Sequence, residues 1–128
     1  MKKKPLIFVV DDDPMVLRLI QETLSDEPVK VMSFNYGEEL IEKLHLGPDL
    51  IILDYIFEKK NALVMNGLEI LTRIRDKNED LPVIILSGQE SGNTVLELMK
   101  AGIEDYIIKG KDFTVKLLIA VQEIINKR

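Results

Sequence analysis

The sequence predicts an α/β fold, a doubly wound sheet of five parallel strands with helices on both faces. Short apolar runs alternate along the chain with longer stretches of helical period, which is the pattern of successive βα units. Three of the runs are almost continuous in apolar, largely branched residues, as strands covered on both faces should be. The predicted strands are residues 6–10, 29–34, 50–53, 83–86 and 106–108.

Five helices are expected between and after these strands, from the spacing of apolar residues and from start and stop signals. Asp13 precedes Pro14, which puts a capping carboxylate before a residue suited to the first helical turn. Asn66 and Asp112 stand in the same position before the third and fifth helices, and Gly47-Pro48 is a stop signal after the second. The predicted helices are residues 14–24, 38–46, 67–75, 94–100 and 113–126.

Composition limits the classes of function. A chain of 128 residues suits one compact domain, residues 1–128. Its net charge of −5 argues against general nucleic-acid binding, which needs a basic surface. The chain has no cysteine, which excludes disulfides, thiolate nucleophiles and cysteine zinc sites and fits a reducing compartment. The apolar run 5–10 is too short to span a membrane and leads directly into three aspartates, which argues against a signal peptide.

Polar side chains follow four of the five predicted strands. Asp11-Asp12 follows the first, Asp54 the third, Ser87 the fourth and Lys109 the fifth. In a parallel sheet these strand ends meet at one edge, where ligands of such folds bind. Carboxylates, a hydroxyl and an ammonium together are the groups of a Mg²⁺ site that also handles a phosphoryl group. The sequence therefore predicts such a site at this edge.

Each of these residues taken alone has a simpler explanation. An aspartate after a strand is commonly a helix cap, a lone serine such as Ser87 is commonly a turn residue, and a lone lysine such as Lys109 is commonly exposed. Within the triplet, Asp13 is the expected cap. Asp11 and Asp12 remain as the pair that would hold the metal.

Four stretches resemble the response-regulator receiver domains of two-component signalling, chemotaxis regulators among them. They are "VVDDDP", "PDLIILDYIF", "LPVIILSG" and "AGIEDYIIKG", in this order at the expected strand ends. The resemblance extends from the first strand to the last helix. It implies a flavodoxin-like (βα)5 domain with the strand order 2-1-3-4-5.

The resemblance also implies roles. Asp54 would accept a phosphoryl group as a carboxylate nucleophile, Ser87 would hydrogen-bond the transferred group, and Lys109 would pair with its oxygens. Tyr106 matches the switch aromatic of the family, whose ring follows the movement of the hydroxyl residue. The alternative for Tyr106 is ordinary packing of a half-buried strand tyrosine. The implied ligands of Mg²⁺, or of Mn²⁺ in its place, are Asp11, Asp12, Asp54 and the backbone carbonyl of Ile56.

The implied partners are proteins. A sensor histidine kinase or a phosphotransfer protein would donate the phosphoryl group from a phosphohistidine. The surface of the fourth helix, fifth strand and fifth helix would carry the signal to a downstream protein, with no direct nucleic-acid or membrane binding. A cytoplasmic signalling domain is expected, which is no enzyme toward other molecules but assists its own phosphorylation and dephosphorylation. His45 near the end of the second helix is expected at the surface, without a role in phosphotransfer.

The sequence departs from the family pattern in three places. Glu58 stands where receivers usually have proline, and an insertion of roughly residues 58–64 lengthens the loop beside Asp54. Gly110 follows the lysine where receivers usually have a proline joined by a cis peptide, so we expect Lys109 to be held less firmly or by a trans bond. Ser87-Gly88 replaces the threonine and alanine of many relatives. No departure removes a chemical group from the site.

Other functions fit less well. One alternative is a receiver-like module that binds partners without phosphorylation. Glu58 and Gly110 favour it, but the intact set of aspartates, Ser87 and Lys109 weighs against it. A Mg²⁺-dependent aspartyl phosphohydrolase would need a second carboxylate two residues after its nucleophile, where this chain has Ile56. A flavin protein of similar topology would need a Ser/Thr/Gly-rich phosphate cradle, which the turns after the first and third strands lack.

Overall fold

A single parallel sheet forms the centre of the molecule. The computed structural model describes residues 4–54, 67–88 and 92–127, and in this part the sheet order is β2-β1-β3-β4-β5. This topology confirms the predicted doubly wound fold and the strand order that the resemblance implies. Every predicted strand is present, with its bounds shifted by no more than one residue. The strands are β1 (Leu6–Val10), β2 (Lys30–Phe34), β3 (Leu50–Asp54), β4 (Val83–Ser87) and β5 (Asp105–Ile108).

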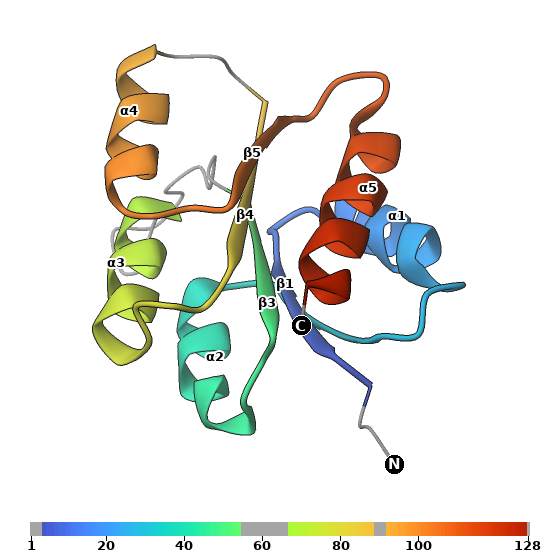
Figure 1. Ribbon diagram of the computed structural model, residues 1–128, viewed down its shortest axis with the longest axis horizontal. Coiled ribbons are helices and arrows are strands. Elements are labelled where there is room, and N and C mark those ends of the chain that lie inside the picture. Colours follow the sequence, from blue (N-terminus) through green and yellow to red (C-terminus); the bar gives the residue numbers. More distant parts are fainter. Residues whose placement is uncertain (1–3, 55–66, 89–91, 128) are drawn as a thin grey trace.

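Helices cover both faces of the sheet (Figure 1). α1 and α5 lie on one face, and α2, α3 and α4 lie on the other. In the described residues, no helix combines the length and the apolar character that crossing a membrane requires. The helices are α1 (Pro14–Leu24), α2 (Gly37–Glu42), α3 (Gly67–Lys77), α4 (Gly92–Lys100) and α5 (Phe113–Asn126), with a 3₁₀ turn η1 (Leu44–Leu46) after α2.

The sheet separates two hydrophobic cores because successive strand residues point to opposite faces. In β1, Phe8 and Val10 enter the core beneath α2, α3 and α4, whereas Ile7 and Val9 enter the core beneath α1 and α5. All residues of β3 and β4 are buried. Burial on both faces explains why these strands have apolar residues at consecutive positions instead of alternating ones.

The second helix differs from the prediction of one helix over residues 38–46. α2 ends at Glu42, and the chain continues through Lys43 into the 3₁₀ turn η1. The Lys43 N–H donates to the carbonyl of Leu40, three residues back, which tightens the last turn. Gly47 then ends the segment in the left-handed conformation, at φ 74°. The predicted stop at Gly47 is therefore confirmed, but the helix before it is shorter.

Two of the three predicted helix caps lie in the described residues, and they differ. Asp13 caps α1, because its Oδ1 accepts a hydrogen bond of 2.9 Å from the Met15 N–H. Asp112 occupies the same position before α5, but its side chain makes no capping hydrogen bond, so this prediction is wrong. The backbone explains the difference, since ψ is 111° at Asp13 and 19° at Asp112, and only the extended residue turns its carboxylate toward the helix. Asn66 lies outside the described residues.

Arg75 of α3 holds the C-terminal end of α4, which lies away from the carboxyl ends of the strands. Its guanidinium donates to the carbonyls of Ala101 at 3.0 Å and Gly102 at 2.7 Å, directly after α4. It also donates to the carbonyl of Leu81 at 2.7 Å, just before β4. The Ala101 carbonyl, which the end of α4 leaves without a helical partner, is thus bound by a charged donor. Gly102 itself is left-handed, with φ 81°.

Candidate functional site

The register of the sheet brings four predicted side chains to one edge. β1 pairs with β3 so that Asp11, the residue after β1, comes level with Asp54 at the end of β3. β3 pairs with β4 so that Ser87 lies one residue beyond the neighbour of Asp54. The last residue of β5 pairs with Ser87, and Lys109 follows it. The edge predicted from the strand ends is therefore present, with these residues on it.

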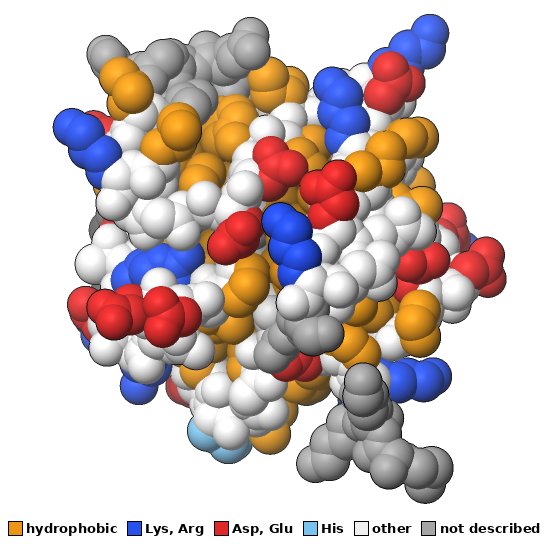
Figure 2. All heavy atoms as spheres, viewed as in Figure 1, with side chains coloured by type: hydrophobic (Ala, Val, Ile, Leu, Met, Phe, Trp, Pro, Cys, Tyr) orange, Lys and Arg blue, Asp and Glu red, His pale blue; other side chains and the backbone are white. Residues whose placement is uncertain are grey.

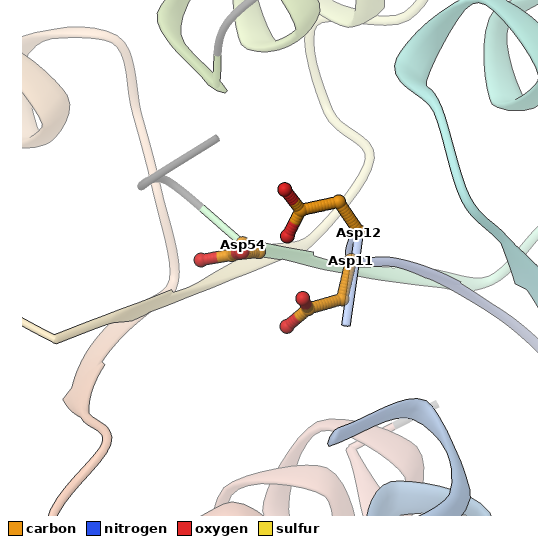
Figure 3. A group of neighbouring side chains, drawn as sticks. All are labelled: Asp11, Asp12 and Asp54. Carbon is orange, nitrogen blue, oxygen red and sulfur yellow. The ribbon is translucent and has the colours of Figure 1, made fainter. Parts of the chain in front are cut away.

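Three carboxylates share this edge. Asp11, Asp12 and Asp54 each offer an oxygen, and the three oxygens lie within 4.8 Å of one another. Figure 3 shows the three side chains extending from the ends of β1 and β3. Asp11 and Asp54 are only 1% and 2% exposed, whereas Asp12 reaches solvent. So much negative charge in a buried place is unfavourable unless a cation offsets it.

Lys109 supplies one such cation. Its Nζ lies 3.0 Å from Asp11 Oδ2 and 3.0 Å from Asp54 Oδ1, so one ammonium joins the two buried carboxylates. The lysine side chain is 21% exposed, and its stem runs from the end of β5 toward β1 and β3. These contacts cross the sheet from an edge strand to its centre.

The pKa values follow from burial and from these charges. Burial and then the charge of Asp54 raise the pKa of the Asp11 carboxyl from 3.8 to about 6, although the Asp13 N–H and Lys109 act in the opposite direction. For Lys109, burial disfavours the charged form, but the charges of Asp54 and Asp11 outweigh it and raise the pKa. The acids in this cluster therefore repel one another, and the lysine keeps its proton firmly.

Asp13 has a second contact, which was not predicted from the sequence. Besides capping α1, its N–H donates to Asp11 Oδ1 at 2.9 Å and so orients that carboxylate. The signal was present in the sequence, because an aspartate commonly accepts a hydrogen bond from the backbone two residues on. The Asp11 N–H in turn donates to the carbonyl of Phe34 at 3.2 Å, which fixes the segment after β1 to the end of β2.

Ser87 and Tyr106 occupy different surroundings. Ser87 is 1% exposed at the end of β4, and its carbonyl accepts a hydrogen bond of 2.7 Å from the Lys109 N–H. Tyr106 lies on β5, is half-buried and packs against the core beneath α2, α3 and α4. Ser87 is thus next to the carboxylate cluster, whereas Tyr106 is part of the packing below α4.

The remaining predictions concern the loop and the histidine. Ile56, Glu58 and the insertion of roughly residues 58–64 lie outside the described residues. His45 is exposed in η1, which precedes β3, and its Nδ1 lies 2.9 Å from the carbonyl oxygen of Glu42. It therefore lies at the surface, as expected, and at the end of β3 opposite to Asp54.

The Lys109–Gly110 peptide is trans, since the described part of the chain contains no cis peptide bond. Of the two arrangements that the sequence left open, a loosely held lysine or a trans bond, the structure has the trans bond. It combines this bond with a defined position of the lysine, because Nζ has both carboxylate contacts.

The residues present fit a divalent cation. Carboxylate oxygens are hard donors, which Mg²⁺ and Mn²⁺ prefer, and three of them lie close enough to share one ion. Lys109 brings one positive charge to this group of three carboxylates. Burial and then the charge of Asp54 raise the pKa of Asp11, and a further cation would offset the repulsion between these two carboxylates. The edge can thus bind a hard cation and a group with anionic oxygens, which is the chemistry of phosphoryl transfer.

Comparisons with known proteins agree with this geometry. Residues 7–122 match the family model of the response regulator receiver domain. The chain is 32% identical over 120 residues to hybrid signal transduction histidine kinase D of Dictyostelium discoideum, covering 91% of this chain and 7% of that protein. It is 31% identical over 124 residues to chemotaxis protein CheY1 of Helicobacter pylori, covering 93% of this chain and 94% of that protein. The BeF3-activated DrrB receiver domain has a similar structure, with a TM-score of 0.82, 26% identity and coverage of 96% and 98%.

The lengths of these relatives differ widely. The chain spans a small part of the Dictyostelium kinase and almost all of the Helicobacter chemotaxis protein. The similarity therefore concerns one domain, which relatives of different overall activity contain.

We predict that Asp11→Asn stabilises the protein at about pH 7 when divalent cations are removed. A carboxyl whose pKa is raised on folding holds its proton more tightly in the folded state, so its stabilising contribution is present at low pH and is lost between about pH 4 and pH 6. The amide removes this loss and keeps an oxygen for the Asp13 N–H. Urea unfolding in a chelator should show a higher free energy of unfolding for the variant at pH 7 and a smaller difference at pH 4.

Asp76→Asn, an exposed change on α3, serves as the control and should have little effect at either pH. A lower stability of Asp11→Asn at pH 7 would show that the contact with Lys109 outweighs the cost of the buried charge.

Proposed function

The chain belongs to the response-regulator receiver family, and we propose that it is a phosphoacceptor domain in which Asp54 receives the phosphoryl group. The observation that carries this proposal is the position of Asp54, which is buried at the end of a central strand with its Oδ1 3.0 Å from Lys109 Nζ. A carboxylate so placed is oriented by the sheet and lies beside a positive charge. We further propose that residues 1–128 act as one receiver domain.

The transfer itself requires mainly position and charge. An oxygen of Asp54 attacks phosphorus and forms an acyl phosphate, while the bond from phosphorus to the donor nitrogen breaks and the leaving imidazole takes up a proton. Lys109 would remain close to the carboxylate and pair with an oxygen of the incoming group. Ser87, buried on the neighbouring strand, would donate its hydroxyl proton to another oxygen.

A divalent cation, Mg²⁺ or Mn²⁺, would neutralise charge on the phosphoryl oxygens when bound. Asp11, Asp12 and Asp54 would hold it, with the Ile56 backbone carbonyl as a further ligand. The close spacing of the three carboxylates and the raised pKa of Asp11 support this assignment. The Asp13 N–H donates to Asp11 Oδ1 and Lys109 Nζ contacts Asp11 Oδ2, so both oxygens of this carboxylate are held in place, and Asp11 would offer an oriented ligand to the ion.

The readout would pass through Ser87 and Tyr106. Movement of the Ser87 hydroxyl toward a phosphoryl group would change the space available to Tyr106 on the adjacent strand β5, and so the surface formed by α4, β5 and α5. This surface has exposed apolar side chains on α4, Leu96 and Met99, which are 58% and 64% exposed. Figure 2 shows hydrophobic side chains gathered over the region of α4. Such a surface suits a downstream protein partner.

The phosphoryl donor would be a sensor histidine kinase or a phosphotransfer protein. The domain would assist its own phosphorylation and dephosphorylation without acting on other substrates, and it would work in the cytoplasm without binding nucleic acid or membrane. Its net charge of −5 supports the expectation that the domain does not bind nucleic acid. A matched relative is a hybrid histidine kinase by its name, which supports a link to such donors.

We predict that incubation with Mg²⁺ and acetyl phosphate adds one phosphoryl group to the protein and that Asp54→Asn abolishes the addition. The amide is not a nucleophile toward phosphorus, while its size leaves the packing at the end of β3 unchanged. Intact mass measurement detects the adduct. Asp26→Asn, an exposed change after α1, is the control and should leave the adduct in place.

An adduct that persists in Asp54→Asn would place the acceptor elsewhere. A protein with no adduct from any small donor would instead be a module that binds its partners without phosphorylation. Continuous release of phosphate at many turnovers would indicate a phosphohydrolase.

We also predict that Asp12→Asn weakens Mg²⁺ binding about tenfold or more, because the amide oxygen that replaces the carboxylate carries no charge and is a weaker ligand. Asp13→Ser should leave the affinity nearly unchanged, since serine can keep the cap of α1 and the Asp13 side chain faces the helix. Isothermal titration calorimetry compares the two variants. Equal losses of affinity would mean that the three aspartates divide their roles differently.

A further inference from the structure

The backbone turns sharply at Lys109. The Gly110 N–H donates to the carbonyl of Ile108 at 2.7 Å, which closes a three-residue turn with Lys109 at its centre. Among the described residues no φ is positive except at glycine, so this is the inverse γ-turn that commonly ends strands. The turn redirects the chain immediately after β5, at the residue whose side chain reaches the carboxylates.

Hydrogen bonds hold this turn on both sides. Before it, the Lys109 N–H donates to the carbonyl of Ser87 at 2.7 Å and continues the pairing of β4 with β5. After it, the Gly110 carbonyl accepts from the Phe113 N–H at 3.3 Å, at the start of α5. The Cα–Cβ direction of Lys109 is therefore set between the end of β4 and the start of α5.

At position 110 this chain uses the main-chain N–H, and the small size of glycine is not needed. A Cβ added to Gly110 would meet only the Ile108 oxygen, at 4.0 Å, which is ordinary contact. Gly110 is also absent from the glycines with positive φ, which in the described residues are Gly47 and Gly102. An alanine could thus take this conformation, whereas a proline lacks the donor that closes the turn.

We propose that Gly110 is a positioning residue, whose main-chain N–H closes the turn that holds the Lys109 ammonium between Asp11 and Asp54. The predicted effect of Gly110 on phosphorylation rests on the proposed function, whereas its predicted effect on the position of Lys109 does not. A lysine side chain has many rotamers, so two contacts of 3.0 Å at Nζ depend on a fixed starting direction. This chain therefore fixes its lysine by a trans turn with an amide donor.

The first experiment compares Gly110→Pro with Gly110→Ala. Gly110→Pro removes the donor, so we expect the rate of phosphorylation by acetyl phosphate to fall about tenfold or more, the size of effect that a small misplacement of a reacting group can have. Gly110→Ala keeps the donor and should react within about twofold of the unchanged protein. Equal rates for the two variants or an equal loss in both would overturn the proposal. So would a faster reaction of Gly110→Pro than of Gly110→Ala, which would show that the proline usual in receivers holds the lysine without this donor.

A double-mutant cycle separates positioning from a general loss of structure. In a Lys109→Gln background the lysine is absent, so Gly110→Pro should cause no further change in the phosphorylation rate. A further loss in that background, comparable to the loss with lysine present, would show that Gly110 acts on something other than Lys109.

A readout without phosphorylation keeps the proposal separate from the proposed function. Mn²⁺ binding, followed by the electron paramagnetic resonance signal of the free ion, reports the charge around the carboxylates. An ammonium displaced from Asp11 and Asp54 repels the ion less, so Gly110→Pro should bind Mn²⁺ several-fold more tightly than Gly110→Ala, and the two should be equal in the Lys109→Gln background. If no variant accepts a phosphoryl group, the proposed function fails while this comparison still decides the role of Gly110.

If Gly110→Pro does not fold, an ester in place of the 109–110 peptide bond removes the same donor without a proline ring. Amide hydrogen exchange of the unchanged protein adds a direct check. The Gly110 N–H should exchange much more slowly than that of the exposed Lys111. Fast exchange at Gly110, or unchanged Mn²⁺ binding in the ester variant, would overturn the proposal.

Discussion

The contact of one ammonium with two buried carboxylates is the interaction on which the rest of this site depends. Asp11 and Asp54 lie almost without exposure at the ends of central strands, where ionised groups are costly unless they are paired. Lys109 at 3.0 Å from both makes the arrangement possible. The pairing remains incomplete, because burial and the charge of Asp54 still raise the pKa of Asp11, and a further cation would offset this remaining cost.

The sheet makes this arrangement of charges possible. Because β1 and β3 are covered on both faces, their direction is fixed by packing, and the register brings Asp11 level with Asp54. A slip of one residue would turn every side chain of a strand to the opposite face, so register is strongly specified here. The same packing places Ser87 beside Asp54 and β5 at the edge of the sheet, where Lys109 and Tyr106 can face different neighbours. The buried strands therefore stabilise the fold, and the charged side chains lie together at the carboxyl ends of these strands.

The fold could be predicted from the sequence because two-sided burial gives the three central strands consecutive apolar residues, and five apolar runs alternate with helical segments. The polar edge could be predicted because parallel strands end together. The turn at Lys109 could not, since backbone hydrogen bonds of this kind leave little trace in residue type. The contact of the Asp13 N–H with Asp11 was not predicted, although an aspartate two residues earlier is a signal for it. Asp112 shows the reverse failure, because a residue suited to capping is present but its backbone does not let it cap. The division of residues 38–46 depended on Lys43, whose conformation no local signal indicated.

A structure of the protein with Mg²⁺ and beryllium fluoride, which imitates a phosphoryl group, would test the role of Asp54. We expect the beryllium on an oxygen of Asp54, fluorine atoms within hydrogen-bond distance of Ser87 Oγ and Lys109 Nζ, and the ion between Asp11, Asp12 and Asp54. The peptide after Lys109 should be trans, with the turn closed by Gly110 unchanged. Beryllium fluoride bound elsewhere, or a Lys109 ammonium turned away from Asp54, would contradict these expectations.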